Sequence, residues 1–415
     1  MHSGGRAGRR AVLEMAMKAP HFAPQPQGAP PPPPPWYRRR ARGRNRYDHL
    51  EIAGAFGDLG TLIPFVVGYI VVLKVDPLGI LLMFGLSQIL VGLFYRTPIP
   101  VQPMKAIAGA AIASGGAVSP AMLCGAGLFT GLFWLLVGST RTVELVTRLA
   151  GKPIIRGIVL GLGLIFMTEG IKAMLVTPWL GGGALVLTFA LLTYRRFPAM
   201  FALCLVGVVA AWFLSPAEAH QVLATRPAFR LPDLVVARMS LGDLVTGSLI
   251  LAVPQLPLTI GNAIIAVRAE NNELFPERPV TDRMLAISQG LINLLAAPFG
   301  GVPMCHGAGG MAGHVRFGAR TGGSLVVLGA LTVGLALFFS GSVALAFQVF
   351  PKAVLGVILF FAGMELALTA RDIGEKKEDV AVMLVVAGFA TWNMGAAFVA
   401  GVTLHQALRR GWVKL

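Results

Sequence analysis

The sequence predicts a polytopic α-helical membrane protein. Of its 415 residues, 55% are hydrophobic and 13% are charged, and 51 are glycines. A soluble domain of this length would need far more charge. The apolar runs are continuous, whereas the strands of a membrane β-barrel alternate apolar and polar residues. Beyond about residue 46 there is room for about fourteen helical spans of ~20 residues with short loops.

The first 46 residues differ from the rest. They hold ten of the 35 Lys and Arg residues and an unbroken proline run from Pro30 to Pro35. Such a segment is predicted to be a disordered, basic, Pro-rich cytosolic tail. No apolar core of signal-peptide length follows its arginines. Two other interpretations stay open: an organelle transit peptide, and a start codon placed too early, because Met15 and Met17 follow.

The remaining chain divides into two halves of seven predicted spans. Residues 47–214 form the first seven-span repeat, residues 215–242 a polar linker loop, and residues 243–415 the second repeat. With the N-terminus inside, inner loops and the C-terminus carry 18 Lys and Arg residues and outer loops carry six. This bias fits the positive-inside rule. Because seven is odd, the second half enters from the opposite side, so the halves are predicted to be inverted repeats.

Span 1 begins near Glu51 and contains Asp58 between Gly57 and Leu59-Gly60. A carboxylate inside a membrane usually marks an ion or proton path, although it can also cap a neighbouring helix. Spans 2 and 4 are predicted at about 78–94 and 121–138, with a broken element as span 3 between them. Span 5 follows a charged loop that extends to Arg156 and ends at about Thr168. Spans 6 and 7 are predicted at about 182–194 and 199–214.

That broken element runs from Pro98 to Ala106, and a matching stretch runs from Gly300 to Gly310. Each has Val, then Pro-Met, then a cationic or titratable residue, then small residues. Interrupted segments in matching places of two halves point to a transporter's substrate site. Prolines end the extended approach, and the small residues that follow allow helices to start, at about Met104 and Cys305. The free N–H groups of such helix starts suit an anion.

Lys105 lies about a turn inside the first half-helix. A lysine at mid-membrane costs roughly 2.5–3.5 kcal/mol on insertion scales, which favours a functional role. The alternative is a kinked helix whose lysine snorkels to the surface. The apolar residues after Lys105 and the second Pro-Met segment argue against that alternative.

Span 8 starts at Asp243 and is predicted to be another broken helix, with polar Gln255, Thr259 and Asn262 on one face. Gln255 lies between Pro254 and Pro257, which favours a pocket role, whereas Asn262 can equally join helices by hydrogen bonds. Later spans are predicted at about 284–297, 323–347 and 353–370, with two more to the end of the chain. Glu365 is either a proton carrier or a structural partner. Glu169 and Lys172 are predicted to form a boundary ion pair.

Several functional classes are excluded or disfavoured. The net charge of +16 follows the tail and the inner loops, so it predicts no nucleic-acid binding. Three cysteines in apolar surroundings give neither a disulfide framework nor a metal spacing. No nucleophile–base spacing or nucleotide loop appears, so we expect no enzyme, no cofactor and no metal site.

Four stretches resemble one family closely: the molybdate transporters related to SulP sulfate permeases. They are Phe56–Thr61, Pro100–Ala108, Pro254–Thr259 and Pro303–Gly310. The second and fourth are long and specific, and the resemblance covers about residue 47 to the end. Sulfate permeases usually carry a STAS domain after the last span; its absence here is expected to fit the molybdate branch better. The resemblance implies a seven-plus-seven inverted repeat like that of uracil permeases, with spans 1–4 and 8–11 as core domain and the others as gate domain.

The resemblance also implies a function: a secondary transporter in the cell membrane, with both termini cytosolic, which imports molybdate by an elevator movement of the core against the gate. Asp58 or Glu365 is the coupling candidate. Sulfate transport, an anion channel and a nucleobase permease stay open as alternatives; tungstate as a substrate and a homodimer also stay open. The expected substrate-binding residues are Gln102, Met104, Lys105, Gln255, Cys305, His306 and Gly307. Of these, Gln102, Gln255 and His306 are expected to donate side-chain hydrogen bonds to the substrate, and Lys105 to offset its charge.

Overall fold

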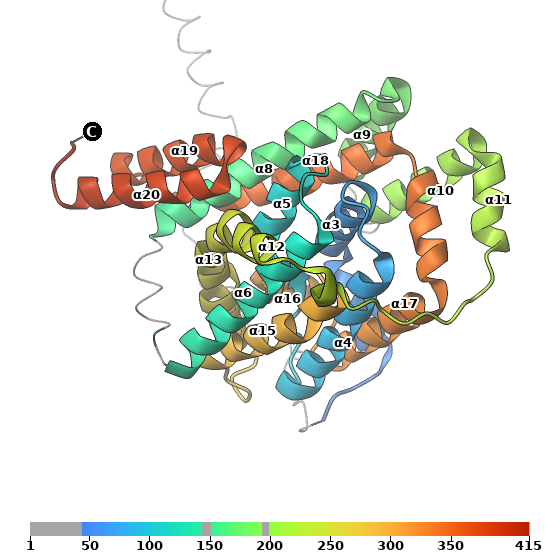
Figure 1. Cartoon of the computed structure of the whole chain (residues 1–415), viewed down its shortest axis with the longest axis horizontal. Helices are drawn as coiled ribbons and strands as arrows, with labels where there is room; N and C mark the ends of the chain where they lie inside the picture. Colours follow the sequence, from blue (N-terminus) through green and yellow to red (C-terminus); the bar gives the residue numbers. More distant parts are fainter. Residues whose placement is uncertain (1–43, 141, 143–150, 193–198, 415) are drawn as a thin grey trace, which may run out of the picture. The chain divides into compact units, whose positions relative to one another are not determined.

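The computed structural model describes residues 44–140, 142, 151–192 and 199–414, which form helices and one pair of very short strands (Figure 1). Most of the predicted tail lies outside the described residues. The first half contains, in order, α2 (His49–Ala55), η2 (Phe56–Asp58), α3 (Leu59–Val71), α4 (Pro77–Tyr95), β1 (Gln102–Pro103), α5 (Lys105–Ala113), α6 (Pro120–Thr140), α8 (Lys152–Met174), α9 (Pro178–Leu192) and α10 (Ala199–Leu214).

The linker between the halves is not only a loop, because it forms α11 (Pro216–Ala224) and η3 (Val235–Arg238). The second half contains α12 (Leu241–Thr246), η4 (Gly247–Ala252), α13 (Val253–Leu258), η5 (Thr259–Ile265), α14 (Ala266–Leu274), α15 (Asp282–Ala296), η6 (Ala297–Phe299), β2 (Met304–Cys305), α16 (Ala308–Arg316), α17 (Gly323–Val349), α18 (Lys352–Leu368), η7 (Thr369–Ile373), α19 (Lys377–Trp392) and α20 (Met394–Arg409).

The contacts between helices have the symmetry of an inverted repeat. By their order in the two halves, α4 corresponds to α15 and α6 corresponds to α17. If each helix is replaced by its counterpart, the contact between α4 and α17 becomes the contact between α15 and α6. Both contacts are extensive. The same exchange leaves the α8–α18 contact and the β1–β2 pair unchanged, and both are present. The two halves therefore pack as two equivalent repeats, in agreement with the predicted repeat architecture.

The helices pack as two groups. We call α2–α6 and α12–α17 the core group; α4 packs on α17 and α6 on α15. We call α8–α10 and α18–α20 the gate group; α18 and α19 both pack on α8, and α19 lies beside α20 (Figure 1). The groups contain the helices expected for the core and gate domains.

Glycines allow α8 and α18, the central helices of the gate group, to touch. A Cβ atom on Gly163 would lie 2.6 Å from the carbonyl oxygen of Gly363, and one on Gly363 would lie 2.5 Å from that of Gly163. Gly170 and Gly356 are related in the same reciprocal way, at 2.6 Å each. Small residues bring helix backbones into direct contact. In a membrane the hydrophobic effect does not drive helices together, because lipid tails are as apolar as the side chains, so close packing of this kind holds them.

Six helices of the described part are long and apolar enough to cross a bilayer, and the bent pair of residues 49–58 and 62–71 makes up to seven. The count of about fourteen spans stays a prediction. By contrast, α5 and α16 have nine residues each, so each is only roughly 14 Å long, about half of the hydrocarbon thickness. They are half-helices, as predicted.

Span 8 differs from its prediction. We expected a break at Pro254 and Pro257, but residues 241–274 form a continuous helical element. The wider turns η4 and η5 are π-helical and flank the two prolines. A π turn changes the hydrogen-bond register, so it lets the helix continue past residues that cannot donate an N–H.

The structure neutralises two acidic side chains in different ways. Glu169 and Lys172 form the predicted ion pair at 2.7 Å, and the Lys172 side chain is exposed. Glu51 is buried, and its carboxylate accepts N–H groups of Arg320 and Thr321 at 2.9 Å and of Ser324 at 3.2 Å, where α17 begins. A helix start thus holds an oxyanion inside this fold.

Candidate functional site

The two half-helices are joined at their starts by β1 and β2. The strands pair antiparallel, with Gln102 opposite Cys305 and Pro103 opposite Met304, and the N–H of Met104 donates to the carbonyl of Pro303 at 2.8 Å. Segments two hundred residues apart thus lie side by side, as predicted. The helix α5 starts at Lys105, close to the expected Met104, but α16 starts at Ala308 rather than near Cys305. β2 keeps Met304 and Cys305 extended.

Two side-chain amides hold the extended segments in place. Gln88 of α4 donates to the carbonyl of Val101 at 3.1 Å and accepts its N–H at 3.4 Å. Asn293 of α15 donates to the carbonyl of Met304 at 2.6 Å and accepts its N–H at 2.8 Å. Both amides are buried. Sequence reasoning missed them; the available signal was an amide residue within an otherwise apolar helix.

Lys105 is the first residue of α5, and it is buried, with 9% exposure. No salt bridge joins it to a carboxylate within the described residues. The next N–H, that of Ala106, donates to Oε1 of Gln255 at 2.7 Å, and Nε2 of Gln255 donates to Thr259 at 3.0 Å. Gln255 therefore lies at the start of this half-helix. Here its oxygen caps α5. The other first-turn N–H groups have no partner inside the helix.

Asp58 and Gln102 meet between η2 and β1. Nε2 of Gln102 lies 2.7 Å from each carboxylate oxygen of Asp58, and both side chains are buried. A Cβ atom on Gly307 would overlap Oε1 of Gln102, and one on Gly310 would lie 2.5 Å from Oδ2 of Asp58. The glycines at the start of α16 therefore leave room for this pair.

This close approach predicts a specific stability difference. Replacing Gly310 by Ala forces Asp58 or α16 to move, and overpacking of this kind costs about 1–3 kcal/mol. A Cβ on Gly309 would meet nothing within 4 Å. We expect G310A to lower the Tm in detergent by several degrees and G309A to leave it unchanged. Equal Tm values for the two variants would contradict this packing.

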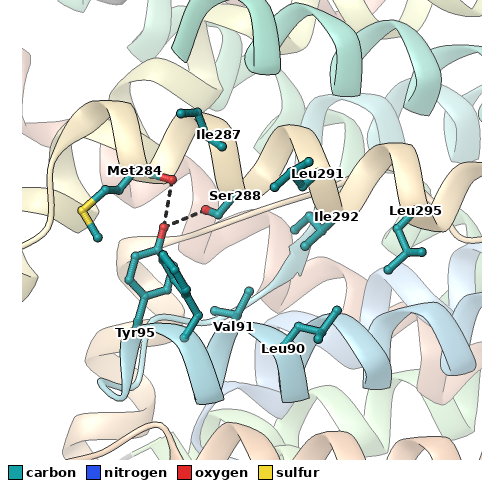
Figure 2. Close-up of a pocket in the computed structure, with 10 residues that line it drawn as sticks. Leu90, Val91, Tyr95, Met284, Ile287, Ser288, Leu291, Ile292 and Leu295 are labelled. Atoms are coloured by element: carbon teal, nitrogen blue, oxygen red, sulfur yellow. Dashed lines mark hydrogen bonds between the residues drawn. The ribbon is translucent and has the colours of Figure 1, made fainter. Parts of the chain in front are cut away.

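His306 is held on both sides of its ring. Nδ1 lies 2.9 Å from the carbonyl oxygen of Pro100, and Nε2 lies 2.7 Å from the hydroxyl of Ser288. The Tyr95 hydroxyl lies 2.7 Å from the same Ser288 oxygen and donates to the carbonyl of Met284 at 3.0 Å (Figure 2). Both ring nitrogens of the predicted substrate donor are thus engaged within the protein.

Tyr95 and Ser288 also line a pocket between α4 and α15 (Figure 2), and its volume is about 380 Å³. The other lining residues are mostly leucine, isoleucine, valine and phenylalanine. A dianion would lose its hydration there without gaining donors, so this cavity does not suit an oxyanion. The polar half-helix starts suit one better.

The other predicted residues fall as follows. Met104, which follows β1, and Cys305, which belongs to β2, are buried in the same hydrophobic cluster. Glu365 lies on α18, in the gate group, and its side chain is outside the described residues. Within the described part of the chain, no group of three or more His, Cys, Asp and Glu side chains could hold a metal ion.

Known proteins resemble this chain over most of its length. The model of a family described as "Molybdate transporter of MFS superfamily" matches residues 50–166 and 247–366. Molybdate transporter 2 of Arabidopsis thaliana is 32% identical, over 90% of this chain and 89% of that protein. Molybdate transporter 1 of Arabidopsis thaliana is also 32% identical, over 86% and 88%.

Solved structures share the fold. The transmembrane domain of the cyanobacterial bicarbonate transporter BicA superposes with a TM-score of 0.61 at 15% identity, covering 85% of this chain and 97% of that one. The murine anion transporter Slc26a9, in its inward-facing state, superposes with a TM-score of 0.66 at 12% identity, covering 90% and 70%. At these identities the likeness concerns the fold alone.

Proposed function

Since this chain belongs to the molybdate transporter family, we propose that it is a secondary transporter that imports molybdate across the cell membrane. The matched family model and the 32% identical relatives make it an integral membrane transporter of anions. One observation carries the assignment of the site: the starts of α5 and α16 meet through β1 and β2, with Lys105 buried at the first of them.

A tetrahedral dianion suits this place for physical reasons. Each helix start contributes about half a positive charge and several N–H donors, and Lys105 adds a full charge. In a low-dielectric surrounding these groups replace the water that the anion gives up. Gln102 and Gln255 flank the site, while Met104, Cys305, His306 and Gly307 shape its wall. Tungstate has the same shape and charge and should enter as well.

Transport then requires the core group to move against the gate group. The two groups touch where α5 packs on α8. There Gly109 of α5 lies against the side chain of Leu162, and a Cβ atom on Gly109 would lie 3.3 Å from the ring of Phe166. A cavity of about 290 Å³ lies between the groups near the end of α5, lined by residues such as Ile112 and Leu355. Smooth apolar contact and open volume let one group slide past the other.

Import of an anion against a negative interior costs about 2.3 kcal/mol per charge per 100 mV. We therefore propose that transport is coupled to protons, through Asp58 or Glu365.

Uptake into proteoliposomes containing the purified protein tests the function. We expect saturable uptake of molybdate, detected by mass spectrometry, and competition by tungstate. Equal competition by excess sulfate would assign the protein to sulfate instead. Uptake that follows only the membrane potential and never saturates would indicate an anion channel. Control liposomes without protein should take up none.

A further inference from the structure

The orientation of the Gln102 amide is the starting point. Its nitrogen faces the two oxygens of Asp58 at 2.7 Å each. Its oxygen Oε1 is buried and has no hydrogen-bond partner within the described residues, and it faces Gly307, the residue before α16. A charged carboxylate can only accept, so it holds the amide nitrogen toward itself.

This orientation is wrong for binding an anion. The atom that Gln102 turns toward Gly307, just before α16, is an oxygen with partial negative charge, whereas its nitrogen lies between Asp58 and Gly310. An oxyanion held by the half-helices would be repelled by it. The amide that the sequence predicts as a donor can therefore donate to the substrate from this side only after its two ends exchange places. Oxygen and NH₂ are nearly the same size, so the exchange needs no extra volume.

We propose that protonation of Asp58 reverses the Gln102 amide, so that one proton and the oxyanion bind together. This inference rests on the proposed function. The carboxyl group of Asp58 takes up one proton and no covalent bond between heavy atoms changes. Its O–H donates to Oε1 of Gln102, and the amide nitrogen turns to the start of α16, where it donates to the substrate. The unpartnered oxygen thereby gains a donor.

The charges around Asp58 support the coupling. Lys105 on α5 and His314 on α16 both lie within electrostatic reach of Asp58. His314 is fixed by a hydrogen bond of 2.7 Å between its Nδ1 and the carbonyl of Gly54. Without substrate, Lys105 stabilises the charged form of Asp58. A bound dianion competes for Lys105 and repels a second negative charge, so it favours the protonated carboxyl. Proton and anion therefore strengthen each other's binding, by the same factor in each direction.

The test measures the KM of molybdate uptake against pH in proteoliposomes. For one coupled proton, the KM of the unmodified protein should fall by up to about tenfold for each unit of decreasing pH above the pKa of the coupled group. In D58N the side-chain amide donates to Gln102 without titrating, so its KM should be independent of pH. Glu169→Gln, at the exposed ion pair of α8, should keep the full pH response.

A second variant tests the amide itself. Q102M keeps the length of the side chain and removes the reversible amide, so its KM at low pH should stay near the value at high pH. A full pH response in D58N, or in Q102M, would overturn the proposal. If D58N does not insert, Q102M alone decides. Loss of the response in Glu365→Gln with its retention in D58N would place the proton on α18. Whether the unmodified protein takes up molybdate at all tests the proposed function separately.

Discussion

Replacing Lys105 by Ala should lower molybdate uptake by at least about 30-fold while the protein still inserts and folds. Truncating one partner of a buried charge pair costs about 2–5 kcal/mol, and 1.4 kcal/mol is a factor of ten. Here the other partner is the substrate, because no carboxylate forms a salt bridge with Lys105 in the described part of the chain. Uptake is measured by mass spectrometry at a molybdate concentration below the KM.

Stability gives this prediction a second readout. The ammonium of Lys105 is buried and forms no salt bridge with a described carboxylate. Its loss of hydration outweighs its longer-range attraction to Asp58, so its removal should leave the Tm unchanged or raise it. If Lys105 were instead a structural cation, K105A would lower the Tm. K172A is the matched control: Lys172 lies exposed at the boundary, paired with Glu169, and its removal should change neither uptake nor Tm measurably. Undiminished uptake in K105A would remove Lys105 from the site.

Replacing Asn293 by Leu should abolish uptake through the scaffold of the site. The variant leaves the buried N–H and carbonyl of Met304 without partners, and each such group costs about 1–3 kcal/mol. Because Met304 belongs to β2, we expect the strand pair that joins the two half-helices to loosen. Thermal unfolding should shift downward by several degrees, and uptake should be lost even where the protein inserts.

The same helix supplies a matched control. Gln289 is buried one turn before Asn293, and both polar atoms of its side chain lack a partner in the described part of the molecule. Q289L exchanges these atoms for methyl groups at similar volume, so it should leave the Tm unchanged or raise it. If Q289L and N293L lower the Tm equally, the loss reflects polarity in general and not the hold on β2.

The proline-broken segments and the buried lysine were visible in the sequence, because prolines and charges are rare in apolar runs and each has few physical explanations. The direction of the side-chain amides was not. Gln255 and Gln102 were both predicted as donors to the substrate. In the structure Gln255 gives its oxygen to Ala106, and Gln102 gives its nitrogen to Asp58. An amide carries a donor and an acceptor, so only its neighbours decide which end faces the site.

The predicted start of the second half-helix and the predicted break in span 8 were wrong for a related reason. Cys305 was expected to begin a helix because small residues follow it, but pairing with Gln102 keeps it extended. Pro254 and Pro257 were expected to break their helix, but two π turns absorb them. Both outcomes depend on packing against residues far away in the chain, which local propensity does not contain.

The sequence by itself determined the membrane class, the two interrupted segments, their inverted relation and the cation at the first of them, since each follows from composition, charge placement or spacing. Only the tertiary structure decided the register of β1 against β2, the hold of Gln88 and Asn293 on them, and which atoms of Gln102 and Gln255 remain for a ligand. The physical reason is that hydrogen bonds between segments two hundred residues apart form in the packed interior, where most buried backbone donors find an acceptor.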